Sequence, residues 1–346
     1  MEHSSNRSRT PFPEMPIPSR GACRPLSRIA CDRARGGDAR QAQHRQARAA
    51  QAAFPAALAV GIALPAAAHQ AGEAAASTAW RWSFEPWVVA LLAASLALYA
   101  LGVLKLWRRA GAGRGITRGQ VACFAGGWLV LALSLTSPID TLGDALFSMH
   151  MVQHELMMVV AAPLFVLSRP LEAWTWALSP ALRRGLAAIA RRAPLAWLWS
   201  ALTEPVGAWA LHAVAIWAWH IPALFGLALV DRTVHGFQHA SFLLTALAFW
   251  WAVLGRIGRR PDANGLASLF TTMLHTGALG ALLTFAPSVW YPHYLAADWP
   301  GLTALEDQQL GGLVMWVPAG LAYLAAGLAL AARWLIPQPP PRRTAD

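Results

Sequence analysis

Residues 148–168 read SMHMVQHELMMVVAAPLFVLS, and this stretch decides the class of fold. It is mostly apolar, and a helix of this length crosses the roughly 30 Å hydrocarbon core of a bilayer at about 1.5 Å of rise per residue. Because lipid offers no hydrogen-bond partners to the backbone, such spans must be helical. Similar runs occur at 87–107, 119–136, 206–227, 236–254, 265–286 and 310–333. We therefore predict an all-α integral membrane protein with seven transmembrane helices.

The composition agrees with this class. The 346 residues are 56% hydrophobic and only 13% charged, whereas soluble domains carry about 25% charged residues. A formal net charge of +11 raises the question of nucleic-acid binding. The basic residues, however, lie in the first 50 positions and between the apolar runs, as the positive-inside rule describes. We expect the lipid bilayer, and no nucleic acid, as a partner.

The N-terminal part of the chain differs in character from the seven spans. Residues 1–50 are rich in Arg, Ala, Pro and Ser, which predicts a disordered basic tail. Residues 51–68 form a short apolar segment ending in three alanines, so they read as a signal peptide or as an extra span. After this signal-like segment we expect a seven-helix membrane domain at 85–335 and a cytoplasmic tail at 336–346.

The basic residues of the connections predict the orientation in the membrane. One side receives only Arg81 and Arg232. The other side receives sixteen basic residues, namely Lys105, Arg108, Arg109, Arg114, Arg118, Arg169, Arg183, Arg184, Arg191, Arg192, Arg256, Arg259, Arg260, Arg333, Arg342 and Arg343. We expect this side to face the cytoplasm, which describes a multi-pass protein of a bacterial inner membrane with a cytoplasmic C-terminus.

Five histidines occupy one layer near the outer, periplasmic ends of the spans. His150 and His154 begin the third span, and His235 and His239 begin the fifth. The i,i+4 spacing places both rings of each pair on one helix face, so two such faces can surround a metal ion. His220, near the outer end of the fourth span, adds a fifth, exchangeable ligand.

The residue types indicate which metal to expect. Imidazole suits Zn, Cu, Fe and Ni, whereas thioether selects Cu(I). Met149 and Met151 flank His150, which favours copper, although methionines in spans are also ordinary packing residues. The three cysteines form no CxxC motif, so neither a thiolate relay nor a zinc site of that kind is available.

The remaining polar residues of the membrane domain leave several interpretations open. His293 lies in the last outer loop and is a candidate accessory ligand. His212 and His275 reach mid-membrane depth, where a histidine serves as a hydrogen-bond partner between helices as readily as in a functional site. The carboxyl group of Glu155 is either protonated or faces a partner, and its role stays open.

Three segments together resemble a known family. They are MHMVQHELMMVVAAPLFVLSRP at 149–170, WHIPALFGLALVDRTVHGFQHASFLLTALAFWW at 219–251 and DQQLGGLVMWVPAG at 307–320. In this order they are similar to the multi-spanning CtaG-type cytochrome c oxidase assembly factors, and the likeness covers roughly residues 85–335. By position, the family's histidines fall on His150, His154, His220, His235 and His239, and Asp307 lies in the final motif.

The resemblance implies a non-enzymatic protein that helps to form the copper site of a haem-copper oxidase. It implies handling of Cu(I) on the periplasmic side. The expected partners are the oxidase subunit that carries the copper site and periplasmic copper donors.

Two other functions stay open at this point. A membrane b-type haem electron carrier needs one imidazole from each of two helices at similar depth, which His154 with His239, or His212 with His275, would supply. A metal permease needs ligands along a path through the membrane, and only His212 and His275 would serve as intermediate positions.

Overall fold

The computed structural model describes residues 80–255, 263–296 and 301–335. Within these ranges the chain forms helices and no strands, so the predicted all-α fold is confirmed. The expected tail at 1–50, the signal-like segment at 51–68 and the C-terminal tail at 336–346 lie outside the described residues, as do Arg256, Arg259 and Arg260.

Six helices are long and apolar enough to cross a membrane, and one bent pair allows a seventh crossing. The predicted spans match these helices to within four residues at each end, except in the fourth and at the start of the last, where α16 begins at Ala304 and not at 310. The six are α4 (Pro86–Ala110), α5 (Arg118–Thr136), a third span over Phe147–Ser168, α14 (Arg232–Leu254), α15 (Ala263–Thr284) and α16 (Ala304–Leu335).

The fourth predicted span is not one continuous helix. It consists of α12 (Pro205–Trp219) and α13 (Pro222–Val230), which are bent by 75° at the break between them. Pro222 explains the break, because it cannot donate to the preceding turn and disfavours helical geometry at Ile221, whose ψ is 124°. At 15 residues, α12 is only about 22 Å long, so the prediction of an unbroken helix over 206–227 is wrong.

The third span contains one turn of π-helix. It runs through α7 (Phe147–Glu155), the π-helical segment η1 (Leu156–Ala161) and α8 (Ala162–Ser168). Pro163 lacks an N–H and would clash with the turn before it in an α-helix, which favours the wider turn. In a π-helix the N–H of residue 163 would donate to the Met158 carbonyl, but proline has no N–H. The Trp250 indole of α14 donates to this carbonyl instead, at 2.9 Å.

Shorter helices connect the spans. The connection between the third span and α12 forms three helices, each with a proline in its first turn, where the missing N–H costs nothing. The short elements are α6 (Pro138–Gly143), α9 (Pro170–Ala177), α10 (Pro180–Ala190), α11 (Ala193–Thr203) and the 3-10 turn η2 (Pro292–Ala296).

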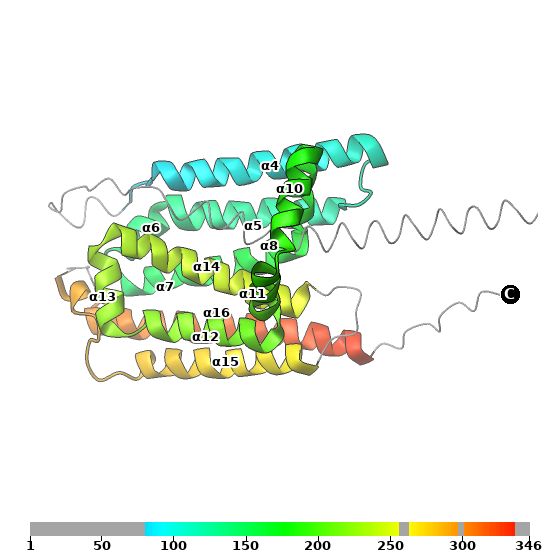
Figure 1. Cartoon of the computed structure of the whole chain (residues 1–346). Helices are drawn as coiled ribbons and strands as arrows, with labels where there is room; N and C mark the ends of the chain where they lie inside the picture. Colours follow the sequence, from blue (N-terminus) through cyan, green and yellow to red (C-terminus); the bar gives the residue numbers. More distant parts are fainter. Residues whose placement is uncertain (1–79, 256–262, 297–300, 336–346) are drawn as a thin grey trace, which may run out of the picture. The chain divides into compact units, whose positions relative to one another are not determined.

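The long helices lie roughly parallel to one another in a bundle (Figure 1). Two buried clusters of side chains hold these helices together. One joins α4, α5 and α9 to the end of the third span, and the other joins the third span to α12–α16. Glycines allow α15 and α16 to approach closely: a Cβ on Gly312 would lie 2.6 Å from the Gly280 carbonyl oxygen. The beginnings of α7 and α14 and the end of α12 thus converge at one end of the bundle, which we call the histidine end.

Candidate metal centre

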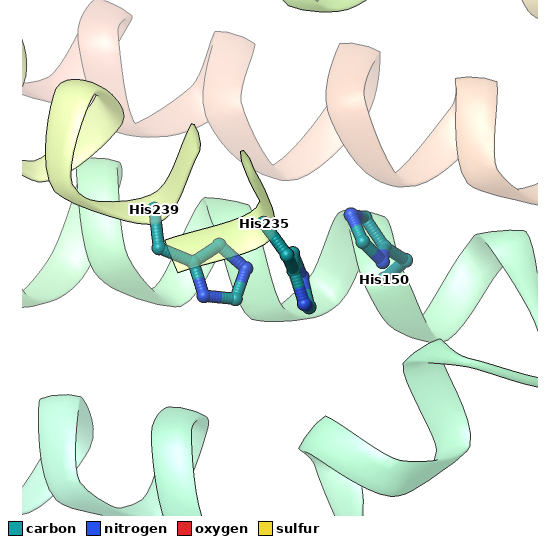
Figure 2. Close-up of side chains that lie close together, drawn as sticks. All are labelled: His150, His235 and His239. Atoms are coloured by element: carbon teal, nitrogen blue, oxygen red, sulfur yellow. The ribbon is translucent and has the colours of Figure 1, made fainter. Parts of the chain in front are cut away.

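Three imidazoles meet at the histidine end. Figure 2 shows His235 of α14 between His239, one turn further along the same helix, and His150 of α7. The ring centroids of His150 and His235 are 5.3 Å apart, and those of His235 and His239 are 4.2 Å apart. One ligand atom from each ring lies within 4.8 Å of the other two. We call these three residues the histidine triad.

The triad has nitrogen atoms free to bind a ligand. His150 and His239 are buried, and His235 is half-buried. Both ring nitrogens of His150, and Nε2 of His235 and His239, are buried without a hydrogen-bond partner. Buried polar atoms are nearly always hydrogen-bonded, because leaving one without a partner costs roughly 1–3 kcal/mol. Three rings that share this deficit and face one another fit a metal ion, which accepts lone pairs from all three.

His154 lies beside the triad, one turn deeper along α7. Its ring centroid is 4.4 Å from that of His150 and 5.2 Å from that of His239. It is buried, and neither ring nitrogen has a hydrogen-bond partner. The Phe242 ring packs against it edge-on, at 4.7 Å. His154 therefore borders the triad without belonging to it.

His220 sits at the break between α12 and α13. Its Nδ1 lies 2.6 Å from the Ile216 carbonyl oxygen, so this nitrogen carries the proton and donates it. The lone pair therefore resides on Nε2, which is buried and has no partner. A backbone carbonyl that fixes the tautomer in this way is typical of metal-binding histidines. The ring centroids of Phe225 and Phe242 lie 6.4 Å and 6.3 Å from that of His220. Phe225 also contacts His150, and Phe242 also contacts His154. His220 therefore adjoins the other histidines through these two phenylalanines.

Two buried glutamines next to the histidines were not singled out from the sequence. Gln153 donates to the Ser134 carbonyl at 2.8 Å and to Asp140 at 2.7 Å, which ties α7 to α5 and α6. Gln238, next to His239, is fully buried and neither of its amide atoms has a partner. An amide inside an apolar span beside a histidine is the signal that could have identified both residues.

Asp307 has a positioning role in the structure. Its two carboxylate oxygens accept hydrogen bonds from the backbone N–H groups of Phe147 and Ser148, at 2.5 Å and 3.1 Å. These N–H groups begin α7 and have no partner within their own helix. Asp307 of α16 therefore caps the helix that carries His150 and His154, and its negative charge also complements the positive end of the helix dipole.

The other candidate accessory ligands lie outside the triad. Met151 is buried in the packing between α7 and α16, where its Cγ would lie 3.3 Å from a Cβ on Gly311. Met149 is half-buried on the first turn of α7. His293 is exposed on η2, with its ring 5.5 Å from that of Tyr294.

Two tyrosines from the connection between α15 and α16 pack against Phe225, which contacts His150. The Tyr291 hydroxyl donates to the His220 carbonyl at 2.9 Å, and the Tyr294 hydroxyl donates to the Gly143 carbonyl at 3.1 Å. Burial, reinforced for Tyr294 by the carboxylates of Asp144 and Asp307, raises the pKa of both phenols well above the ordinary value. Both hydroxyls therefore keep their protons, and they tie the connection to α12 and α6.

His212 and His275 belong to a separate place, deeper in the bundle. His212 Nδ1 lies 3.0 Å from the Thr245 hydroxyl, which itself donates to the Phe242 carbonyl, so His212 donates to Thr245. His275 Nδ1 accepts from the Trp217 indole at 3.4 Å, so its proton is on Nε2. That tautomer does not suit axial ligation of a haem iron through Nε2 of His275.

Glu155 lies away from the triad. It is half-buried, one of its carboxyl oxygens has no hydrogen-bond partner, and it lies close enough to Tyr323 of α16 to interact with it electrostatically.

Comparison with known proteins identifies the family. The sequence profile of the cytochrome c oxidase caa3 assembly factors (Caa3_CtaG) matches residues 97–336, so the chain belongs to this family. The resemblance inferred from the three motifs is thereby confirmed.

The curated relatives are themselves uncharacterised proteins. One from Mycobacterium leprae is 26% identical over 248 residues, which cover 68% of this chain and 37% of the relative. Relatives from Mycobacterium bovis and Mycobacterium tuberculosis are each 27% identical over 265 residues, covering 73% of this chain and 39% of the relative. The chain thus spans less than two fifths of the length of these relatives. No solved structure matches.

Proposed function

We propose that this oxidase assembly factor handles copper, as Cu(I), for the copper site of a haem-copper oxidase. The observation that carries the proposal is the histidine triad, in which buried, unpartnered ring nitrogens from two helices lie within 4.8 Å of one another. The proposed role is binding and transfer, without catalysis.

The donor set supports copper over a hard cation. Imidazole is a ligand of Cu, Zn, Fe and Ni, whereas Mg²⁺ and Ca²⁺ prefer oxygen. Neutral imidazoles add no negative charge, so they favour a monovalent ion that must be released again. Met149, next to His150 on the first turn of α7 and only half-buried, is the proposed first contact for Cu(I).

The remaining residues would divide the work of holding and releasing the ion. His154 is the proposed fourth ligand, and His220, with its lone pair fixed on Nε2 by the Ile216 carbonyl, is the proposed exchangeable one. Asp307 holds α7, and hence His150, against α16. The ion would be passed on by exchange of one imidazole at a time.

The proposed location follows from charge. Sixteen basic residues in the connections on one side of the membrane, against two on the other, support a periplasmic histidine end in a bacterial inner membrane. There the protein would receive copper from periplasmic donors and transfer it to the oxidase subunit.

A competition titration of the purified protein against a chromophoric Cu(I) chelator tests this proposal. We expect one Cu(I) per chain and at least tenfold weaker binding in His150→Ala and His235→Ala, because each loses one of three ligands. His293→Ala is the matched control, since this exposed histidine lies outside the triad. Equal affinity in all four proteins would refute the proposed site.

The same variants test the role in the cell. In a deletion strain grown in limiting copper, oxidase activity should return with the wild type and with His293→Ala but not with the triad variants. A strong Soret band in the purified protein, sharpening on reduction, would instead establish the haem alternative. Copper uptake into proteoliposomes above that of empty vesicles would establish a permease.

A further inference from the structure

An apolar cavity lies on the back of the helix that carries two of the three triad histidines. It has a volume of about 300 Å³ and is bounded by α8, α9, α11, α12 and α14. Along α14 it runs from Phe237 to Trp251, a distance of about 21 Å at 1.5 Å per residue. Trp251 packs edge-on against Trp199 of α11, with ring centroids 6.1 Å apart, at the end away from the triad.

One helix that borders this cavity, α11, is apolar, and the described part of the chain leaves it exposed. α11 reads APLAWLWSALT, none of its residues is buried, and Trp197 is 71% exposed. In water such a surface would be strongly unfavourable. An apolar molecule of the membrane must therefore cover it.

The size of the cavity distinguishes between two possible occupants, a helix of a partner protein and a hydrocarbon chain of a lipid. A helix of a partner protein is about 10 Å wide with its side chains. A cavity of about 300 Å³ that extends over about 21 Å is narrower than such a helix. A single hydrocarbon chain is narrow enough to enter the cavity. Because the cavity is longer than the roughly 15 Å depth of one bilayer leaflet, it has room for the full length of such a chain.

The charge around the start of α11 indicates the headgroup. Arg191 and Arg192 are exposed immediately before this helix, and Arg184 is exposed on α10. Within the described part of the chain, none of the three lies within salt-bridge distance of a carboxylate. Arg192 precedes Leu198, which lines the cavity, by about 9 Å of helix. Basic residues at this depth attract anionic lipid headgroups.

We propose that the cavity is a binding site for one chain of an anionic phospholipid whose phosphate lies against Arg191 and Arg192. The site is independent of the histidine triad, because it lies on the opposite face of α14. The lipid fastens α11 to α14 and so braces the helix that carries His235 and His239.

Native mass spectrometry of the full chain, released from nanodiscs of equal phosphatidylglycerol and phosphatidylcholine content, tests the site. The wild type should retain one phosphatidylglycerol. Ala248→Trp places an indole in the cavity and should lower the ratio of lipid-bound to free protein at least tenfold. Val214→Trp, on an exposed face of α12 outside the cavity, is the control and should leave the ratio unchanged.

Two further variants separate the chain from the headgroup. Ala248→Leu fills less of the cavity than Ala248→Trp and should lower lipid retention severalfold. This smaller substitution still tests the site if Ala248→Trp does not fold. Arg191→Gln combined with Arg192→Gln should abolish the preference for phosphatidylglycerol while retaining some lipid. Unchanged retention in the folded Ala248 variants, or equal retention of both lipids by the wild type, would overturn the proposal. So would a second membrane protein that co-purifies with the wild type in place of lipid and is lost in Ala248→Trp.

Discussion

At the scale of single residues, the candidate centre depends on side chains that lack partners. Four of the triad nitrogens are buried without hydrogen bonds, whereas two polar residues nearby, Gln153 and Asp307, are bonded to other groups. Gln153 has two acceptors for its amide nitrogen, and Asp307 accepts from two backbone N–H groups. This contrast separates groups that position the site from groups that are free to bind.

Asp307→Asn tests the positioning role. The amide oxygen keeps one acceptor, but the second acceptor and the negative charge at the start of α7 are lost. We expect about 1–2 kcal/mol lower stability against unfolding in detergent, and weaker Cu(I) binding, because α7 carries His150. Glu306→Gln is the matched control, since among the described residues Glu306 bonds to Thr303, just before α16, and not to α7. Equal effects of the two substitutions on copper affinity would contradict this assignment.

Much of this residue-scale arrangement was predictable from spacing. Two i,i+4 histidine pairs at matching depth led us to expect their rings on facing helix surfaces, and three of the four rings form the triad. The cap by Asp307 was not predictable, because the sequence separates this residue from Ser148 by 159 positions. Only the packing of α16 on α7 brings them together.

At the scale of elements, prolines account for both departures from regular helices. Pro222 ends α12 next to His220, and Pro163 accompanies the π-helical turn one turn after His154. Each proline was visible in the sequence. The sequence alone did not reveal whether the helix continues past a proline. This depends on which group donates a hydrogen bond to the carbonyl that the proline leaves without a partner. For Met158 the partner is Trp250 from another helix.

A double-mutant cycle tests this account of the π-helical turn. Trp250→Phe leaves the Met158 carbonyl buried without a partner and should cost about 1–3 kcal/mol. Pro163→Ala restores an N–H near the same carbonyl, so the double variant should be less destabilised than the sum of the two single changes. Unfolding in mixed micelles measures all four proteins. Strict additivity would show that the two residues do not share this carbonyl.

At the scale of the whole molecule, the close pairing of α15 and α16 places Asp307 against α7. Gly312 is the contact point, since an added Cβ would lie 2.6 Å from the Gly280 carbonyl oxygen and from the Thr284 nitrogen. Separation of the two helices would move Asp307 and loosen α7. Stability and copper affinity are therefore expected to change together.

Gly312→Ala should lower stability by about 1–3 kcal/mol through overpacking and should weaken Cu(I) binding through the displaced cap. Gly320→Ala on the same helix is the control, because an added Cβ there meets no atom within 4 Å. It should be neutral or stabilising, by up to about 1 kcal/mol, as expected for glycine to alanine in a helix. Unfolding and chelator competition are measured on the same samples. If Gly312→Ala lost stability but bound copper normally, the proposed link between the pairing of α15 with α16 and copper affinity would be refuted.

X-ray absorption at the copper edge tests the central claim most directly. The Cu(I)-loaded wild type should show a first shell of at least three nitrogen neighbours at about 2.0 Å, with the outer-shell scattering of imidazole. The imidazole signal should fall in His235→Ala and remain unchanged in His293→Ala. A first shell made mainly of sulfur or oxygen, or a spectrum identical in wild type and His235→Ala, would contradict copper binding by the histidine triad.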